Sequence, residues 1–127
     1  MKLFKVEEAN AMLPTARRIV LQIQGSYRRL LSFREPARLA SEQAETSGGG
    51  GFAPGSSQYV TALLGMVERA GELEALGIQI KDYARGLIDF PCMRDGRIVL
   101  LCWQLGEGDE IEWWHDVEAG FAGRQPL

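Results

Sequence analysis

The chain has 127 residues, of which 46% are hydrophobic and 24% are charged, and its formal net charge is −3. A chain of this length fits one domain, residues 1–127, and this composition excludes wholesale disorder. The acidic balance argues against a nucleic-acid partner, and the lack of any run of about eighteen apolar residues argues against a membrane span. Because no apolar run follows the first lysines, we expect no secretory signal and predict a cytoplasmic protein.

Residues 1–45 predict a short N-terminal turn followed by a long helix. The turn is expected from Val6 to Leu13, and Pro14 suits the first turn of the helix, where its missing N–H is not needed. Apolar residues then recur in steps of three and four, the heptad spacing of a coiled-coil seam. The seam comprises Leu13, Ala16, Val20, Ile23, Tyr27 and Leu30. Pro36 is expected to kink or end the helix, although the residues beyond it can resume helical structure.

Residues 46–57 contain four consecutive glycines, which predict a flexible linker. A second helix is expected over residues 58–76, and Gly77 followed by Ile78 is typical of a helix stop. Its apolar positions, again in steps of three and four, are Tyr59, Leu63, Met66, Ala70, Leu73 and Leu76. Two helices joined by such a linker predict an antiparallel hairpin. Because seams of this length can recruit a second copy, we predict a homodimer formed through the helical hairpin.

Residues 78–116 predict an antiparallel β-meander of three to four strands, so the fold class is α+β. The sequence RDGR at residues 94–97 is a hairpin signal, and a two-residue turn there would place Cys92 opposite Val99 and Asp89 opposite Cys102. The last strand is expected from Glu110 to His115. One face of the sheet should pack on the hairpin, while the other needs cover from the C-terminal tail, residues 117–127, or from a partner chain.

Candidate functional residues are concentrated in the last third of the chain. Asp89 lies between apolar neighbours and needs a partner if it is buried, and Arg97 or Arg124 could supply one. His115 is expected to share a strand face with Ile111 and Trp113. The candidate ligand-binding group consists of Asp89, Arg97, Trp103, His115, Asp116 and Arg124.

The same third contains residues that could form a metal site, an acid/base group or a nucleophile. The weak candidates for metal ligands or for acid/base chemistry are His115, Asp116 and Glu118. A single histidine argues against a metal, so the sequence predicts no metal and no cofactor. Cys92 and Cys102 are expected to be free thiols on neighbouring strands. The LLCW context of Cys102 favours a packing role over a nucleophile.

Four segments carry a family resemblance that spans nearly the whole chain: LFKVEEANAMLP, KDYARGLIDFP, GRIVLLCWQLGE and WWHDVEAGFAGRQPL. They resemble the bacterial family known as domain of unknown function 2203. The resemblance implies a small soluble bacterial protein with a helical hairpin and a sheet, and it brings no known activity, cofactor or catalytic residue. The matching positions are Lys81, Asp82, Gly86, Asp89, Arg97, Trp103, Glu107, His115 and Arg124.

Three functional hypotheses follow. The first is a structural or interaction module that acts as a homodimer, with a possible protein partner at the tryptophan-rich end; it implies no enzymatic activity. The alternative is a protein that binds a small anionic ligand or a metal at the sheet edge around Asp89, Arg97 and His115, with the arginines clamping the anion. The arginines of the long helix raise a third hypothesis, nucleic-acid binding, but a solvated face that pairs with the acidic C-terminal third explains them better.

Overall fold

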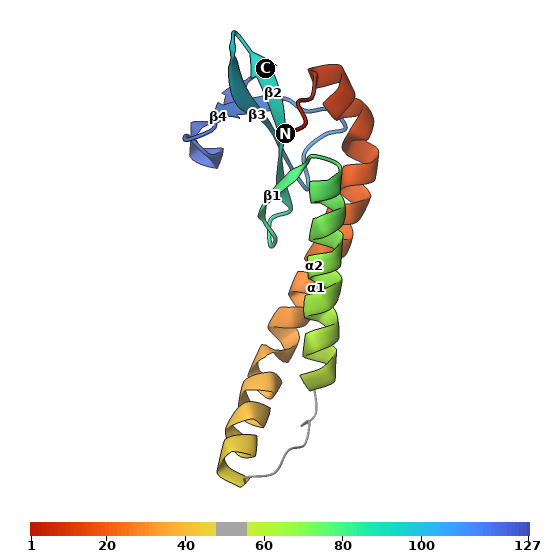
Figure 1. The fold of residues 1–127 in the computed structure, drawn as a ribbon, viewed down its shortest axis with the longest axis vertical. Coiled ribbons are helices and arrows are strands. Elements are labelled where there is room, and N and C mark those ends of the chain that lie inside the picture. The colour runs from red at the N-terminus through yellow and green to blue at the C-terminus, as the bar shows by residue number, and fades with distance from the viewer. Residues whose placement is uncertain (48–55) are drawn as a thin grey trace.

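A computed structural model of the protein describes the backbone of residues 1–47 and 56–127 and the side chains of residues 1–33 and 57–127. Two helices precede a five-stranded antiparallel sheet, which confirms the predicted α+β class (Figure 1). The elements are α1 (Val6–Ser47), α2 (Ser56–Ala75), β1 (Gln79–Asp82), β2 (Leu87–Arg94), β3 (Arg97–Gln104), β4 (Trp113–Asp116), the 3-10 helix η1 (Phe121–Gly123) and β5 (Gln125–Pro126). The predicted linker over residues 46–57 lies mostly outside the described residues.

Helix α1 begins earlier than predicted. The expected separate turn from Val6 to Leu13 is wrong, because those residues form the first turns of one continuous helix. The Glu8 carboxylate accepts a hydrogen bond from the backbone N–H of Lys5, 3.0 Å away, and so satisfies a donor at the helix start. Pro14 therefore lies inside the helix, where it removes one backbone hydrogen bond without ending the helix. The helix also continues past Pro36 to Ser47.

Helices α1 and α2 pack against each other and run side by side in opposite directions (Figure 1). Five of the six predicted seam residues of α1 are buried, and Tyr27 is half-buried and stacks on Tyr83. In α2 the prediction holds at Ala70 and Leu73 but fails at Leu63, which is 37% exposed, because Ala62 occupies the buried position instead. The apolar residues of α2 thus divide between a buried and an exposed stripe.

Helix α2 ends in the predicted manner. The N–H of Gly77 bonds to the carbonyl of Glu74 at 2.9 Å, and the N–H of Ile78 bonds to the carbonyl of Leu73 at 3.0 Å. Gly77 has a φ of 86°, which an L residue rarely adopts. These two bonds and the left-handed glycine define a Schellman motif, which directs the chain from α2 into β1.

The sheet has the strand order β1-β2-β3-β4-β5, and every pair of neighbours is antiparallel. Asp95 and Gly96 have φ values of 52° and 79°, as a two-residue hairpin turn of the primed kind requires. The predicted register is confirmed, because Cys92 pairs with Val99 and Asp89 pairs with Cys102. The fourth strand begins at Trp113 rather than Glu110, and the C-terminal tail adds β5 as a fifth strand.

The two faces of the sheet have different environments. Residues that point toward the helices form the main core together with α1 and α2, and they include Ile88, Phe90, Val99, Leu101, Trp103 and Trp114. The opposite face carries Asp89, Cys102 and His115, which are also buried. The tail helps to cover this second face, since the Arg124 guanidinium lies 5.0 Å from the ring centre of Trp113, whose register partner is Cys102.

Among the described residues, no helix has the length and hydrophobicity needed to cross a membrane.

Candidate functional site

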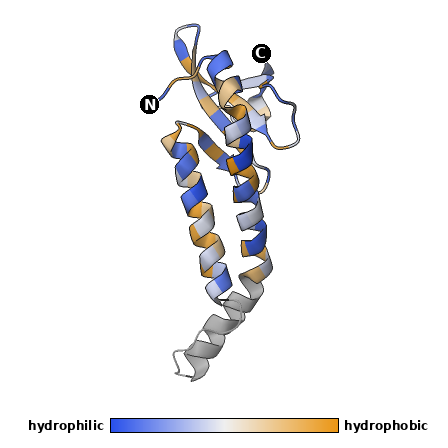
Figure 2. Ribbon diagram, turned by 90° about the vertical axis from the view of Figure 1, so that its right-hand side faces the viewer, coloured by the Kyte–Doolittle hydropathy of each residue, from blue (hydrophilic) through white to orange (hydrophobic). Residues whose placement is uncertain are grey.

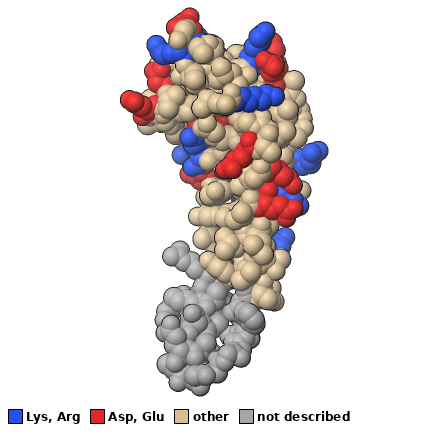
Figure 3. All heavy atoms as spheres, in the orientation of Figure 1, with Lys and Arg blue, Asp and Glu red and all other residues tan. Residues whose placement is uncertain are grey.

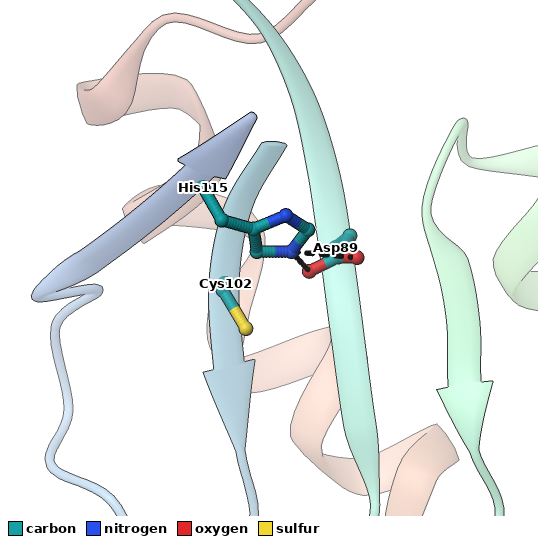
Figure 4. A group of neighbouring side chains, drawn as sticks. All are labelled: Asp89, Cys102 and His115. Atoms are coloured by element: carbon teal, nitrogen blue, oxygen red, sulfur yellow. Dashed lines mark hydrogen bonds and ion pairs between the residues drawn. The ribbon is translucent and has the colours of Figure 1, made fainter. Parts of the chain in front are cut away.

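The second face of the sheet holds a buried ion pair between Asp89 on β2 and His115 on β4. The Nε2 atom of His115 lies 3.1 Å from Oδ1 and 3.2 Å from Oδ2 of Asp89. The two side chains are 3% and 2% exposed. The imidazole reaches across β3, which separates the two strands, so the contact joins three neighbouring strands (Figure 4).

The hydrogen bonds of His115 define where its protons lie. Nδ1 is 2.8 Å from the backbone carbonyl oxygen of Asp116, which can only accept, so Nδ1 carries a proton. Nε2 faces both oxygens of Asp89, so a second proton lies between the ring and the carboxylate. The two side chains therefore share one proton between Nε2 and the carboxyl group, and together they carry no net charge. Such a pair can exist away from water because each polar group has its partner within hydrogen-bonding distance.

Cys102 on β3 completes the group. Its sulfur, a carboxylate oxygen of Asp89 and a ring nitrogen of His115 all lie within 4.8 Å of one another. Figure 4 shows these three side chains on one face of the sheet, each from a different strand. Burial, and next the negative charge of Asp89, raise the pKa of the Cys102 thiol to about 12. The thiol therefore stays protonated at neutral pH, and both ring nitrogens of His115 are occupied, so this geometry does not provide an activated nucleophile.

Neither predicted arginine partners Asp89. Arg97 donates from Nε to Asp116 at 3.0 Å, in a pair whose side chains are 58% and 44% exposed. Arg124 contacts both oxygens of Glu107 at 2.8 Å, in a pair that is 11% and 20% exposed. The expectation failed because an arginine was the natural counter-ion for a buried carboxylate, whereas the strand order brings the histidine to it.

Arg124 and Glu107 hold the C-terminal tail against the sheet. Oε1 of Glu107 also accepts a hydrogen bond from the N–H of Gln104 at 2.8 Å, which fixes the turn after β3. The Arg124 guanidinium lies 5.0 Å from the ring centre of Trp113 and 4.8 Å from that of Phe121. No sequence pattern predicts the pairing of Glu107 with Arg124. The position of Glu107 in a Gly-Glu-Gly turn was the one local signal available.

The remaining candidates are dispersed. Trp103 belongs to the helix-facing core and donates from Nε1 to the carbonyl of Gly108 at 2.9 Å. The weak candidates for metal ligands do not lie together, because Asp116 contacts Arg97 and Glu118 is exposed in the turn after β4. Ile111 does not share a face with His115 but lies in the helix-facing core. The six-residue ligand group therefore reduces to Asp89 and His115, joined by Cys102.

Comparisons with known proteins identify the family but no activity. A protein-family model described as "Uncharacterized conserved protein (DUF2203)" matches residues 2–127. No curated protein and no solved structure matches the chain. Since the match covers nearly the whole chain, as the resemblance of the four segments predicts, the chain belongs to the family of uncharacterized conserved proteins called DUF2203.

Proposed function

We propose that the protein is a structural or interaction module that acts as a homodimer, paired through the exposed face of α2. The observation that carries this proposal is an exposed apolar stripe on that helix. Val60, Leu64 and Val67 are 46%, 62% and 58% exposed, and Leu63 beside them is 37% exposed. These side chains would gain free energy by leaving water, at about 1.5–3 kcal/mol for each aliphatic side chain that becomes fully buried.

The spacing of the stripe supports pairing with another helix. Val60, Leu64, Val67 and Gly71 follow one another in steps of four, three and four, the same heptad spacing as the buried seam. A Cβ atom added to Gly71 would meet nothing within 4 Å, so a second helix has room to approach there. Helix α2 has 20 residues, which corresponds to about 30 Å of helix and is long enough for a helix–helix interface. Two hairpins joined in this way would form a four-helix arrangement.

Charged side chains are distributed unevenly over the face of the molecule that Figure 3 shows. In Figure 3, acidic and basic side chains gather over the sheet and the adjoining part of the hairpin, and few appear on the lower described part of the hairpin in this view. Figure 2 shows hydrophobic residues recurring along α2 over the same length. A surface with apolar side chains and few charges loses little hydration free energy when a second copy covers it.

The competing anionic-ligand function at the sheet edge has less support. It requires guanidinium groups that are free to clamp an anion, whereas Arg97 and Arg124 are already paired with Asp116 and Glu107. An incoming anion would have to displace a carboxylate from each arginine. The geometry therefore favours the interaction module over the anion-binding protein.

The test is the mass of the protein in solution, measured by light scattering during gel filtration over a range of concentrations. We expect the wild type to have twice the monomer mass of 14.1 kDa, and the variant Leu64→Glu/Val67→Glu to be a monomer. The matched control is Val117→Glu, because Val117 is 58% exposed like Val67 but lies after β4. A monomeric wild type, or a double variant that remains dimeric, would overturn the proposal.

A further inference from the structure

We propose that Asp89, Cys102 and His115 form a binding site for one divalent cation of the zinc class. Each residue presents one donor atom to a common space, and the three donor atoms lie within 4.8 Å of one another. Sulfur, imidazole nitrogen and carboxylate oxygen are the three protein ligands that Zn²⁺ uses, whereas Mg²⁺ and Ca²⁺ prefer oxygen alone. All three residues are buried, so bulk water does not compete with the protein donors.

The distances suit a small tetrahedral ion. A zinc ion that binds nitrogen and oxygen at its usual bond lengths holds those two atoms about 3.3 Å apart. Nε2 of His115 lies 3.1 and 3.2 Å from the two oxygens of Asp89, so this edge of the polyhedron already exists. Both oxygens face the ring nitrogen, and a carboxylate bound through both would bring the number of donor atoms to four. The Cys102 sulfur lies within 4.8 Å of both other donor atoms, and a bound zinc ion would hold it about 3.6 Å from Nε2, the matching sulfur–nitrogen edge.

His115 is oriented as a metal-binding histidine is. Its Nδ1–H donates to the backbone carbonyl of Asp116 at 2.8 Å, which fixes the ring and directs Nε2 toward Asp89 and Cys102. Histidines that bind metals commonly donate their other ring N–H to a carbonyl or a carboxylate in this way. That hydrogen bond would remain unchanged when Nε2 exchanges its proton for an ion.

The charge balance of the site also permits a divalent ion to replace two protons. Without an ion, His115 and Asp89 with their shared proton and the neutral Cys102 thiol sum to zero charge. When a divalent ion binds, the shared proton and the proton on the Cys102 sulfur leave, and the carboxylate, the thiolate, the neutral imidazole and the ion again sum to zero. The buried region therefore carries no net charge in either form. The ion would join β2, β3 and β4 through one residue each, and so stabilise the sheet.

The experiment is a titration of chelator-treated protein with Co²⁺, which reports a thiolate ligand through a sulfur-to-cobalt charge-transfer absorption. We expect one equivalent to bind with this absorption in the wild type and in Cys92→Ser, and the absorption to vanish in Cys102→Ser. Cys92 is the matched control because it is a buried free thiol on the same strand as Asp89 but faces the helices. Zn²⁺ should then displace the cobalt and abolish the absorption.

Two further measurements cover the case in which Cys102→Ser fails to fold. One equivalent of Zn²⁺ should raise the melting temperature of the wild type and of Cys92→Ser, and His115→Gln should lose that increase. During partial unfolding, Zn²⁺ should slow alkylation of Cys102 relative to Cys92. Absence of stoichiometric binding to the wild type, or a cobalt spectrum that survives in Cys102→Ser, would overturn the proposal. The dimer mass is measured separately, so the two proposals stand or fall independently.

Discussion

Replacing Asp89 with asparagine should destabilise the protein far more than breaking an exposed ion pair of similar length. The substitution keeps the shape of the side chain but leaves the buried His115 ring without its counter-ion. Breaking one side of a buried pair costs about 3–5 kcal/mol, a large part of the roughly 5–15 kcal/mol that stabilises a typical domain. Both side chains are almost fully buried, so screening by solvent does not reduce this value.

The matched comparison is Arg97→Gln, which breaks the 3.0 Å contact with Asp116. That pair is about half exposed, and exposed pairs contribute only about 0.2–1 kcal/mol. The assay is urea unfolding followed by tryptophan fluorescence, with a chelator present so that no metal contributes. The dependence of the unfolding free energy on urea concentration should be the same in all variants. A double-mutant cycle with His115→Gln should give a coupling energy of about 1–3 kcal/mol between the two residues.

Two results would refute this reasoning. One is a cost for Asp89→Asn no larger than that for Arg97→Gln. The other is a double-mutant cycle in which the costs of Asp89→Asn and His115→Gln simply add. Either would mean that burial does not set the strength of this pair.

Three further predictions concern backbone space, thiol ionisation and the tail. Gly86 and Gly96 both have a positive φ, which costs an alanine about 1–2 kcal/mol, but a Cβ at Gly86 would also lie 2.6 Å from the side chain of Leu105, whereas one at Gly96 would meet nothing within 4 Å. Chemical denaturation should therefore show a larger loss of stability for Gly86→Ala than for Gly96→Ala, and equal losses would contradict this. Cys102 keeps its proton in the folded state up to a pKa of about 12, while the unfolded state loses it near 9.0, so stability should fall with rising pH by about 1.4 kcal/mol per unit between those values. The contribution of Cys102 is the pH dependence of the unfolding free energy of the wild type minus that of Cys102→Ala. Equal pH dependences in the two proteins would contradict the prediction. Arg124→Lys keeps the charge but loses the planar contacts with two aromatic rings, so limited proteolysis should cleave the tail faster than in the wild type; unchanged cleavage would count against a clamping role.

Local sequence signals determined the parts of this fold that depend on near neighbours. Steps of three and four marked the seam of α1, and Gly77 marked the end of α2. The Asp95-Gly96 turn set the register of β2 and β3, which placed Asp89 opposite Cys102. Each of these features is decided within a few residues by periodicity or by turn chemistry, and for that reason the sequence was sufficient.

The helix contacts and the partners of the charged groups depended on tertiary structure. Helix α2 carries two apolar stripes at heptad spacing, and only its packing against α1 decided that Ala62 is buried while Leu63 and Leu64 are exposed. No local rule separates two stripes of the same period, because the difference lies in the surface of the other helix.

The candidate site shows the same division. The sequence identified Asp89 and His115 as candidate site residues. It predicted an arginine as the partner of Asp89, because arginine is a usual counter-ion for a carboxylate. The loop over residues 105–112 is irregular, so the predicted start of β4 is wrong, and no sequence pattern indicates how far His115 reaches across β3. Chain direction and strand order, rather than any local motif, bring Asp89, Cys102 and His115 together from three strands, because hydrogen bonding between neighbouring strands acts between residues distant in sequence.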